Sequence, residues 1–136
     1  LGWFYPAEYV PSAELPDEEY PFILMTGRIL YHYNTRAMTG KTPGLMEKAG
    51  HSFIEMNTED AARLGVADGE KVRVTSRRGT LITTARVGEK VSPKETWMPF
   101  HFPDGNANIL TNAALDKYAR IPEYKVCAVK VEKCES

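Results

Sequence analysis

The chain consists of short apolar segments separated by turn residues, and this pattern limits its fold more than any other feature. Strand-like segments are expected at 22–25, 52–56, 70–76, 80–87, 96–98 and 124–132. In the third of these, Val72 and Val74 fall on one face of a strand, and charged or polar residues fall on the other. Many short strands of this kind are typical of a small β-barrel or sandwich with few helices. We therefore expect a mainly β fold.

Two short helices are predicted between these strands. Asn57 is a favourable N-cap residue, acidic side chains follow it, and Gly65 suits the left-handed conformation that ends many helices. A second short helix is expected over 113–118, ending before Pro122. A hairpin tip is predicted at 77–79, where the two arginines are expected to face solvent.

The first 21 residues differ in composition from the rest of the chain. They contain four of the nine prolines, and proline favours extended backbone over helix or central strand. They also contain aromatic residues that would be unusual in a free tail: Trp3, Phe4, Tyr5 and Tyr9. We therefore expect residues 1–21 to be an extended linker whose aromatics dock on a preceding domain, and residues 22–136 to form one domain.

Composition and cysteine usage exclude several classes of protein. The hydrophobic fraction of 43% and the net charge of −1 argue against general disorder and against a nucleic-acid binder. No apolar run approaches membrane-span length, so no membrane insertion is expected, and no signal peptide is visible. Cys127 and Cys134 lack metal-site spacing, and Cys127 is expected to be a small buried hydrophobe. Unpaired cysteines favour a reducing, cytoplasmic location. A periplasmic one stays open, since any signal would precede residue 1.

The densest group of polar side chains follows the first predicted strand. Residues 26–40 contain two arginines, one histidine, one asparagine, three threonines and two glycines. Guanidinium groups, hydroxyls and backbone N–H groups beside glycine can together cradle an anion such as phosphate. The same residues could equally form a solvated loop over a core. Two other polar loops, 99–112 and 122–125, interrupt the apolar scaffold, and loops that converge at one end of a barrel commonly form ligand sites.

The run 26–40 resembles the start of the C-terminal cofactor-binding domain of molybdenum and tungsten oxidoreductases that carry a bis-pyranopterin guanine dinucleotide. Within that family, it is most similar to the formate dehydrogenase alpha subunit. The resemblance continues in order through 53–62, 64–66, 68–74, 76–79, 98–102, 108–111, 114–116 and 121–129. It covers nearly the whole chain and implies a double-psi β-barrel, which the strand pattern alone cannot name.

The resemblance also implies which residues contact the cofactor. The matching positions are Arg28, His32, Asn34 and Arg36 in the first polar loop, His101 and Asn108 in the second, and Tyr124 and Lys125 in the third. Gly27 is added because the backbone can approach a ligand closely at glycine, and Thr39 and Thr111 are added as hydroxyl donors.

Some of these residues have a structural alternative. His32 and His101 could be histidines satisfied inside the core, and Lys125 could be an ordinary solvent-facing charge. Ile29 departs from relatives that carry a polar residue at this position, so only its backbone could contribute to a site. Arg28, which follows a strand and a glycine, is the strongest candidate.

The implied function is that of the cofactor-binding part of a larger enzyme. The cofactor would be molybdopterin guanine dinucleotide with molybdenum or tungsten, shared with domains absent from this chain. The sequence contains no recognisable metal-ligating cysteine loop, iron–sulfur cysteine cluster, catalytic triad or carboxylate pair. No catalytic or metal-ligating residue is therefore predicted, and the chain alone should not oxidise formate. The expected partners are the remaining domains of the parent subunit, with any iron–sulfur cluster there, and iron–sulfur or other electron-transfer subunits.

Two alternatives to a formate dehydrogenase remain open. The first keeps the cofactor and changes the enzyme, with nitrate reductase or a formylmethanofuran dehydrogenase subunit as candidates. The second is a non-enzymatic double-psi barrel that acts as an adaptor, in which the polar loops would bind protein rather than a nucleotide.

Overall fold

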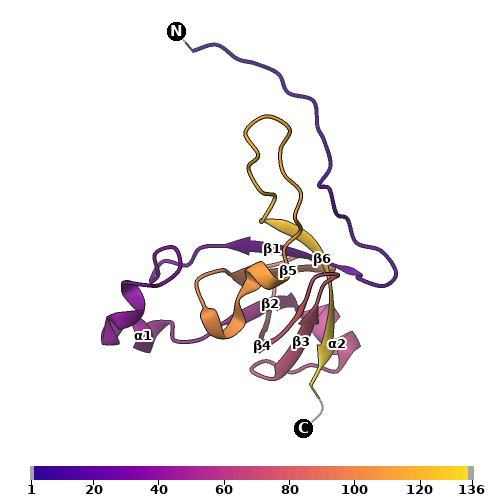
Figure 1. Cartoon of the computed structure of the whole chain (residues 1–136). Coiled ribbons are helices and arrows are strands. Elements are labelled where there is room, and N and C mark those ends of the chain that lie inside the picture. Colours follow the sequence, from indigo (N-terminus) through magenta and orange to yellow (C-terminus); the bar gives the residue numbers. More distant parts are fainter. Residues whose placement is uncertain (1, 135–136) are drawn as a thin grey trace.

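A closed β-barrel forms the centre of the computed structural model, which describes residues 2–134 (Figure 1). Its strands within these residues are β1 (Phe22–Gly27), β2 (Phe53–Asn57), β3 (Lys71–Thr75), β4 (Thr80–Gly88), β5 (Glu95–Pro99) and β6 (Val126–Lys133). Around the barrel the strands follow the order β1-β5-β2-β4-β3-β6.

The barrel mixes parallel and antiparallel pairs. β1 pairs with β5 and β2 pairs with β4 in parallel, whereas the other neighbouring strands are antiparallel. Two long excursions leave the barrel, the β1–β2 loop (residues 28–52) and the β5–β6 connection (residues 100–125). Neither joins strands that are neighbours in the barrel. The closed, mixed barrel confirms the predicted double-psi architecture.

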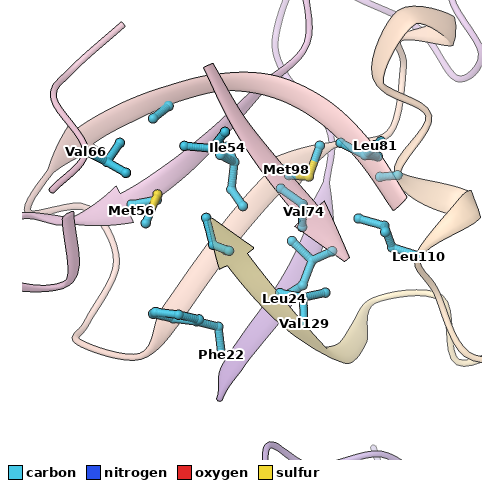
Figure 2. Close-up of a cluster of buried hydrophobic side chains, with 14 of the residues drawn as sticks. Phe22, Leu24, Ile54, Met56, Val66, Val74, Leu81, Met98, Leu110 and Val129 are labelled. Carbon is cyan, nitrogen blue, oxygen red and sulfur yellow. The ribbon is translucent and has the colours of Figure 1, made fainter. Parts of the chain in front are cut away.

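Alternate strand residues fill the barrel interior, as the sequence pattern predicts. Val72 and Val74 of β3 both point inward and have no exposed surface. Figure 2 shows the cluster that they join, in which Leu24, Ile54 and Met98 come from three different strands. Because side chains from several strands share this one core, the barrel ends are held as a rigid frame for the loops.

The two cysteines are free thiols. Cys127 lies on β6 inside the barrel with no exposed surface, which confirms its prediction as a small buried hydrophobe. Burial raises the pKa of the Cys127 thiol to about 11, so the thiolate is scarce at neutral pH and the side chain is chemically inert.

The helix predicted after Asn57 is present as α2 (Thr58–Leu64). The Asn57 side chain accepts a hydrogen bond from the Glu59 N–H at 3.0 Å, and Gly65 ends the helix with a φ of 65°. A further helix, α1 (Pro43–Lys48), lies in the β1–β2 loop and was not predicted. None of the helices described within residues 2–134 has the length and apolar character that crossing a bilayer requires.

The helix expected over 113–118 is wrong. This stretch belongs to an arm (residues 113–123) that projects from the barrel as an open loop (Figure 1). Leu115 and Pro122 form an isolated bridge across its base, and the Asp116 carboxylate accepts three backbone N–H bonds that fold its tip into a turn. A helix this short needs an apolar face packed on the core, but most arm residues are exposed.

Residues 12–20 form a strap that binds the barrel, although residues 2–11 are exposed along their length. Glu14 is the main anchor of the strap. Its carboxylate accepts hydrogen bonds from Arg77 at 2.8 Å and from Arg78 at 2.6 and 2.9 Å. The segment preceding the barrel is therefore divided into a bound part and a free part (Figure 1).

The strap also gives Arg77 and Arg78 partners that the predicted hairpin tip did not include, although both residues are exposed as expected. Arg77 pairs with Asp17 of the strap and lies 4.5 Å from the centre of the Tyr20 ring. Arg78 uses its Nε to donate to the Leu110 carbonyl at 3.0 Å. A local turn pattern could not reveal these partners, because Glu14 lies more than 60 positions away in the sequence.

Glu14→Gln should free the strap. Burial raises the pKa of the Glu14 carboxyl, but hydrogen bonds from Arg78, the Ala128 N–H and Arg77 outweigh it and hold the pKa below its usual value. The ionised group therefore stabilises the fold above pH ~4.3, and this contribution is lost as the pH falls through the lower folded-state pKa. We expect the variant to lose about 1 kcal/mol of stability at neutral pH.

Heteronuclear NOE values of amides 12–20 would measure the release of the strap. In the Glu14→Gln variant they should fall to the values of residues 2–11. Glu18→Gln is the matched control, since Glu18 is an exposed carboxylate of the same strap. Unchanged order in the Glu14 variant would show that packing, rather than the carboxylate, holds this segment.

Candidate functional site

Strand topology brings three polar segments to the same end of the barrel. β1 and β5 are parallel, so their C-terminal ends lie side by side, with Gly27 in register with Pro99. β6 is antiparallel to β1, so it begins where β1 ends, with Met25 opposite Val126. The segments that follow β1, follow β5 and precede β6 therefore meet at one edge. They line a cleft of about 540 Å³, a usual size for a ligand site.

Polar and aromatic side chains line this cleft, and none of them is a carboxylate. The lining residues are Arg28, Asn34, Thr35, Phe100, Asn108, Thr111, Asn112, Pro122 and Tyr124. The predicted site residues that the structure brings together here are Arg28, Asn34, Asn108, Thr111 and Tyr124. Such a surface is suited to an anion that also carries flat, hydrogen-bonding rings.

Arg28 is the cationic group of the cleft. Its guanidinium carbon lies 5.2 Å from the centre of the Phe100 ring, and Nη2 donates a long hydrogen bond of 3.4 Å to Asn34 Oδ1. Arg28 forms no ion pair with any carboxylate in the described part of the chain. Aromatic and amide neighbours thus orient the guanidinium while its charge stays available to a ligand.

The β5–β6 connection supplies the opposite wall. The backbone of Asn108 is fixed in a tight turn by the Asn106 side chain, and the Thr111 hydroxyl donates to the Asn108 carbonyl at 3.2 Å. The Asn108 side-chain amide is therefore exposed, and the backbone that carries it is fixed. Tyr124 packs edge-on against Phe100, with ring centres 6.3 Å apart, so the two ends of this connection meet in an aromatic pair that lines the cleft.

His32, Arg36 and Thr39 lie outside the cleft lining and hold the β1–β2 loop together. His32 is buried and donates from Nε2 to the Ala49 carbonyl at 2.6 Å, while Nδ1 lies 3.0 Å from Thr39 Oγ1. Arg36 donates to the Gly50 carbonyl at 2.9 Å. These side chains use their polar atoms within the chain, as in the structural alternative considered for His32.

His101 is also interior, with 1% of its surface exposed. Its Nε2 accepts a hydrogen bond from the Ile29 N–H at 3.0 Å, and its Nδ1 bonds the Asn34 carbonyl. Burial lowers the pKa of the His101 imidazole below its ordinary value; the bond to Asn34 opposes this, and nearby His32 and Arg28 lower it further. The ring therefore joins the β1–β2 loop to the β5–β6 connection directly behind the cleft.

The two remaining predicted residues also lie outside the lining. A side chain at Gly27 would overlap the Trp97 ring on the neighbouring strand β5, so packing between the two strands already favours glycine there. Lys125 is exposed and its backbone carbonyl accepts a hydrogen bond from the Thr26 N–H at 3.2 Å. In the part of the chain that the structure covers, no three His, Cys, Asp or Glu residues are grouped as metal ligands would be.

Sequence reasoning missed Thr35, Phe100, Asn112 and Pro122 as lining residues. Phe100 lies among the prolines that force the chain out of the barrel after β5, and this was the available signal for it. The Asn112 amide donates to the Val126 carbonyl at 3.0 Å and its oxygen accepts from the Ala114 N–H, which fixes the base of the arm beside the cleft.

Comparison with known proteins identifies the family of this barrel. The family described as "Molydopterin dinucleotide binding domain" matches residues 22–128, which include the whole cleft. The chain belongs to this family. The matched range also contains β1 to β5 and the start of β6, so the family and the barrel coincide.

Its relatives are much larger proteins. The F420-dependent formate dehydrogenase subunit alpha of Methanocaldococcus jannaschii is 49% identical over 97% of this chain, which spans 20% of that relative. A nitrate reductase of Symbiobacterium thermophilum is also 49% identical, over 89% of this chain and 17% of its own length. Acetylene hydratase from Pelobacter acetylenicus has the same fold, with a TM-score of 0.74 at 18% identity over 86% of this chain and 19% of its own.

Proposed function

We propose that this chain is the C-terminal cofactor-binding domain of a formate dehydrogenase-like oxidoreductase subunit. In this proposal the cleft holds the guanosine pyrophosphate part of a molybdenum or tungsten bis-pyranopterin guanine dinucleotide. The observation that carries it is the un-neutralised Arg28 guanidinium, set among amides, hydroxyls and aromatic rings at the open end of the barrel. Membership of the family names the class of ligand, and the donors of the cleft fit that class.

Arg28 fits the pyrophosphate. A guanidinium offers a planar fork of N–H donors that can bond two phosphate oxygens at once. Stacking on Phe100 and the bond to Asn34 restrain the side chain before any ligand arrives, which lowers the entropy lost on binding. Thr111 adds a hydroxyl to the same cleft. The absence of a carboxylate among the described lining residues means that no negative side chain competes with the phosphate oxygens.

Amides and aromatic rings fit the flat parts of the ligand. Asn34 and Asn108 each offer a donor and an acceptor, the combination that guanine and pterin edges require. Phe100 and Tyr124 offer apolar faces at right angles to one another. We propose that His32, Arg36, Thr39 and His101 act by shaping the β1–β2 loop, and that Gly27 and Lys125 complete the rim.

The electron chemistry would belong to the bound cofactor, and this chain would supply binding and orientation. We therefore expect no formate oxidation by the chain alone. A formate dehydrogenase is favoured because relatives with that name are similar over nearly the whole chain. The nitrate reductase at equal identity supports the same cofactor role in a different enzyme. Two free thiols are consistent with a cytoplasmic location.

Exposed apolar side chains suit contact with the rest of a parent subunit. Trp3, Phe4 and Tyr5 are each more than 80% exposed, as is Tyr118 of the arm. The strap that follows the free segment is joined to the base of the arm, because the Ala13 N–H donates to the Glu123 carboxylate at 3.0 Å. We propose that residues 1–21 cross from a preceding domain, and that iron–sulfur or other electron-transfer subunits bind elsewhere on the parent enzyme.

Titration with GDP tests the proposed cleft. GDP stands for the guanosine pyrophosphate part of the cofactor, and this chain should bind it weakly because the rest of the enclosing surface lies in other domains. We expect amide shifts near 27–39, 101–111 and 124–125 in two-dimensional NMR spectra of the chain. Shifts confined to 77–78, or none at millimolar GDP, would instead support an adaptor that binds protein.

A further inference from the structure

We infer that His101 is a positioning residue for the cleft. As a neutral imidazole with its proton on Nδ1, it fixes the backbone that carries Arg28 and Asn34. This inference rests on the proposed function of the cleft for its consequence in ligand binding. Its structural part concerns the loop alone and can be measured without a ligand.

The two hydrogen bonds of His101 fix its tautomer. The Ile29 backbone N–H can only donate, so Nε2 must carry a free lone pair to receive its bond of 3.0 Å. The Asn34 backbone carbonyl can only accept, so Nδ1 must carry the proton. An imidazolium ion has no acceptor nitrogen. Protonation of His101 therefore has to break the bond to Ile29.

The surroundings of the ring keep it neutral. Phe100 and Phe102 pack against it, with ring centres 4.9 and 6.4 Å away. The titratable and charged groups that face it are His32, whose ring centre is 6.0 Å away, and Arg28, both from the β1–β2 loop. No carboxylate within residues 2–134 is hydrogen-bonded to the ring, and burial together with His32 and Arg28 outweighs the bond to the Asn34 carbonyl, which favours the cation.

The backbone that His101 holds is the part that aims the ligand-binding side chains. Ile29 directly follows Arg28, so its N–H bond fixes the peptide from which the guanidinium extends. Asn34 has a φ of 43°, in the left-handed region that non-glycine residues rarely adopt. Its carbonyl bond to His101 helps to hold this conformation. Arg28 and Asn34 both line the cleft, and both belong to the β1–β2 loop.

This arrangement predicts a pH dependence opposite to simple electrostatics. If His101 touched a phosphate, its protonation would add positive charge and tighten binding as the pH falls. If His101 positions Arg28, its protonation releases Ile29 and weakens binding. GDP itself gains a proton on its terminal phosphate near pH 6, so the informative quantity is the pH dependence of the wild-type chain minus that of a His101 variant.

NMR of the imidazole nitrogens between pH 8 and pH 5 tests the structural part. We expect a protonated Nδ1 and an unprotonated Nε2 at neutral pH, with an apparent pKa below about 6.5. The Ile29 amide should shift with the same midpoint. A proton on Nε2, or an Ile29 amide that does not follow His101, would overturn the inference. His51→Gln, which removes an exposed histidine, should leave these signals unchanged.

Two substitutions test the consequence for binding. His101→Phe keeps the aromatic packing and removes both hydrogen bonds, and His101→Gln keeps a polar group that can restore one of them. We expect GDP affinity at pH 7.5 to fall roughly tenfold in the first and less in the second. In the wild-type chain, GDP binding should weaken toward low pH by more than the protonation of GDP itself explains. Both variants should lose this additional weakening.

The outcomes separate this inference from the proposed function. Suppose that the wild-type chain binds GDP, and that His101→Phe binds it with the same affinity and leaves the Ile29 and Asn34 amide signals unshifted. This result would overturn the positioning role of His101 but would still support the cleft as the binding site. A wild-type chain that binds no GDP, yet shows the expected tautomer and the linked Ile29 shift, would overturn the cleft while His101 still fixes the loop.

Discussion

Arg28→Ala should weaken GDP binding by roughly 10- to 100-fold while leaving the barrel folded. An arginine–phosphate hydrogen bond typically contributes about 1.5–3 kcal/mol, and Arg28 brings the cleft its one positive charge among the lining residues. The side chain is exposed and packs on Phe100 without entering the core, so stability should change little. Calorimetry or NMR titration of the chain measures the affinity. In a full-length enzyme, the corresponding measurement is cofactor retained after purification.

The control for this prediction is another exposed arginine of the same barrel. Arg73 lies on the outer face of β3, away from the cleft, so Arg73→Ala should bind GDP as the wild-type chain does. Arg28→Lys should fall between wild type and Arg28→Ala, because lysine keeps the charge but loses the planar fork. Full affinity or full cofactor retention in Arg28→Ala would remove Arg28 from the site.

Gly105→Ala should cause the largest loss of stability among these variants. Gly105 is buried, and a Cβ atom at this position would overlap the side chain of Ser52, the residue just before β2. Overpacking in a rigid interior typically costs about 1–3 kcal/mol and sometimes more, against a total stability of about 5–15 kcal/mol for a small domain. Relief of this overlap would push the turn bearing Asn108 outward and so disturb the cleft. Urea unfolding measures the loss of stability, and GDP titration measures the change in binding.

Two further variants show whether the overlap is the cause. Gly44→Ala is the matched control, because a Cβ there meets no atom within 4 Å and alanine suits the α1 helix. Ser52→Gly should restore part of the stability when combined with Gly105→Ala, since it removes the atoms that collide. If the double variant is no better than Gly105→Ala alone, the turn is sensitive for another reason.

Local signals in the sequence predicted most of the frame of this fold. The alternation at Val72 and Val74 depends only on neighbouring residues, as do the N-cap at Asn57 and the left-handed Gly65. The failed helix over 113–118 was also argued locally, but its outcome depended on whether the barrel offered a surface for packing. The double-psi topology was predicted from the family resemblance. The alternation of apolar and polar residues within one strand does not indicate which other strands it pairs with.

The site was predicted in part, for a related reason. Arg28 and Asn34 belong to a polar run directly after a strand, so they could be found by their chemistry. An interior His101 was one of two alternatives considered, but its partner Ile29 could not be predicted, because it lies 72 positions away. The same holds for Glu14 of the strap, whose bonds to Arg78 span 64 positions. The sequence shows which histidines and arginines can form hydrogen bonds. Their partners are distant in the sequence and become neighbours only when the chain folds.

The pairing of β6 also bears on how the domain reaches its final state. β6 closes the barrel by bonding β1 on one side and β3 on the other. During synthesis, both edges of β1 therefore stay unpaired until the residues of β5 and β6 have emerged from the ribosome. Such distant pairings make folding slow, and open strand edges favour association between chains. A chain that stopped before Val126 would leave β1 and β3 open and would aggregate rather than settle into a smaller barrel.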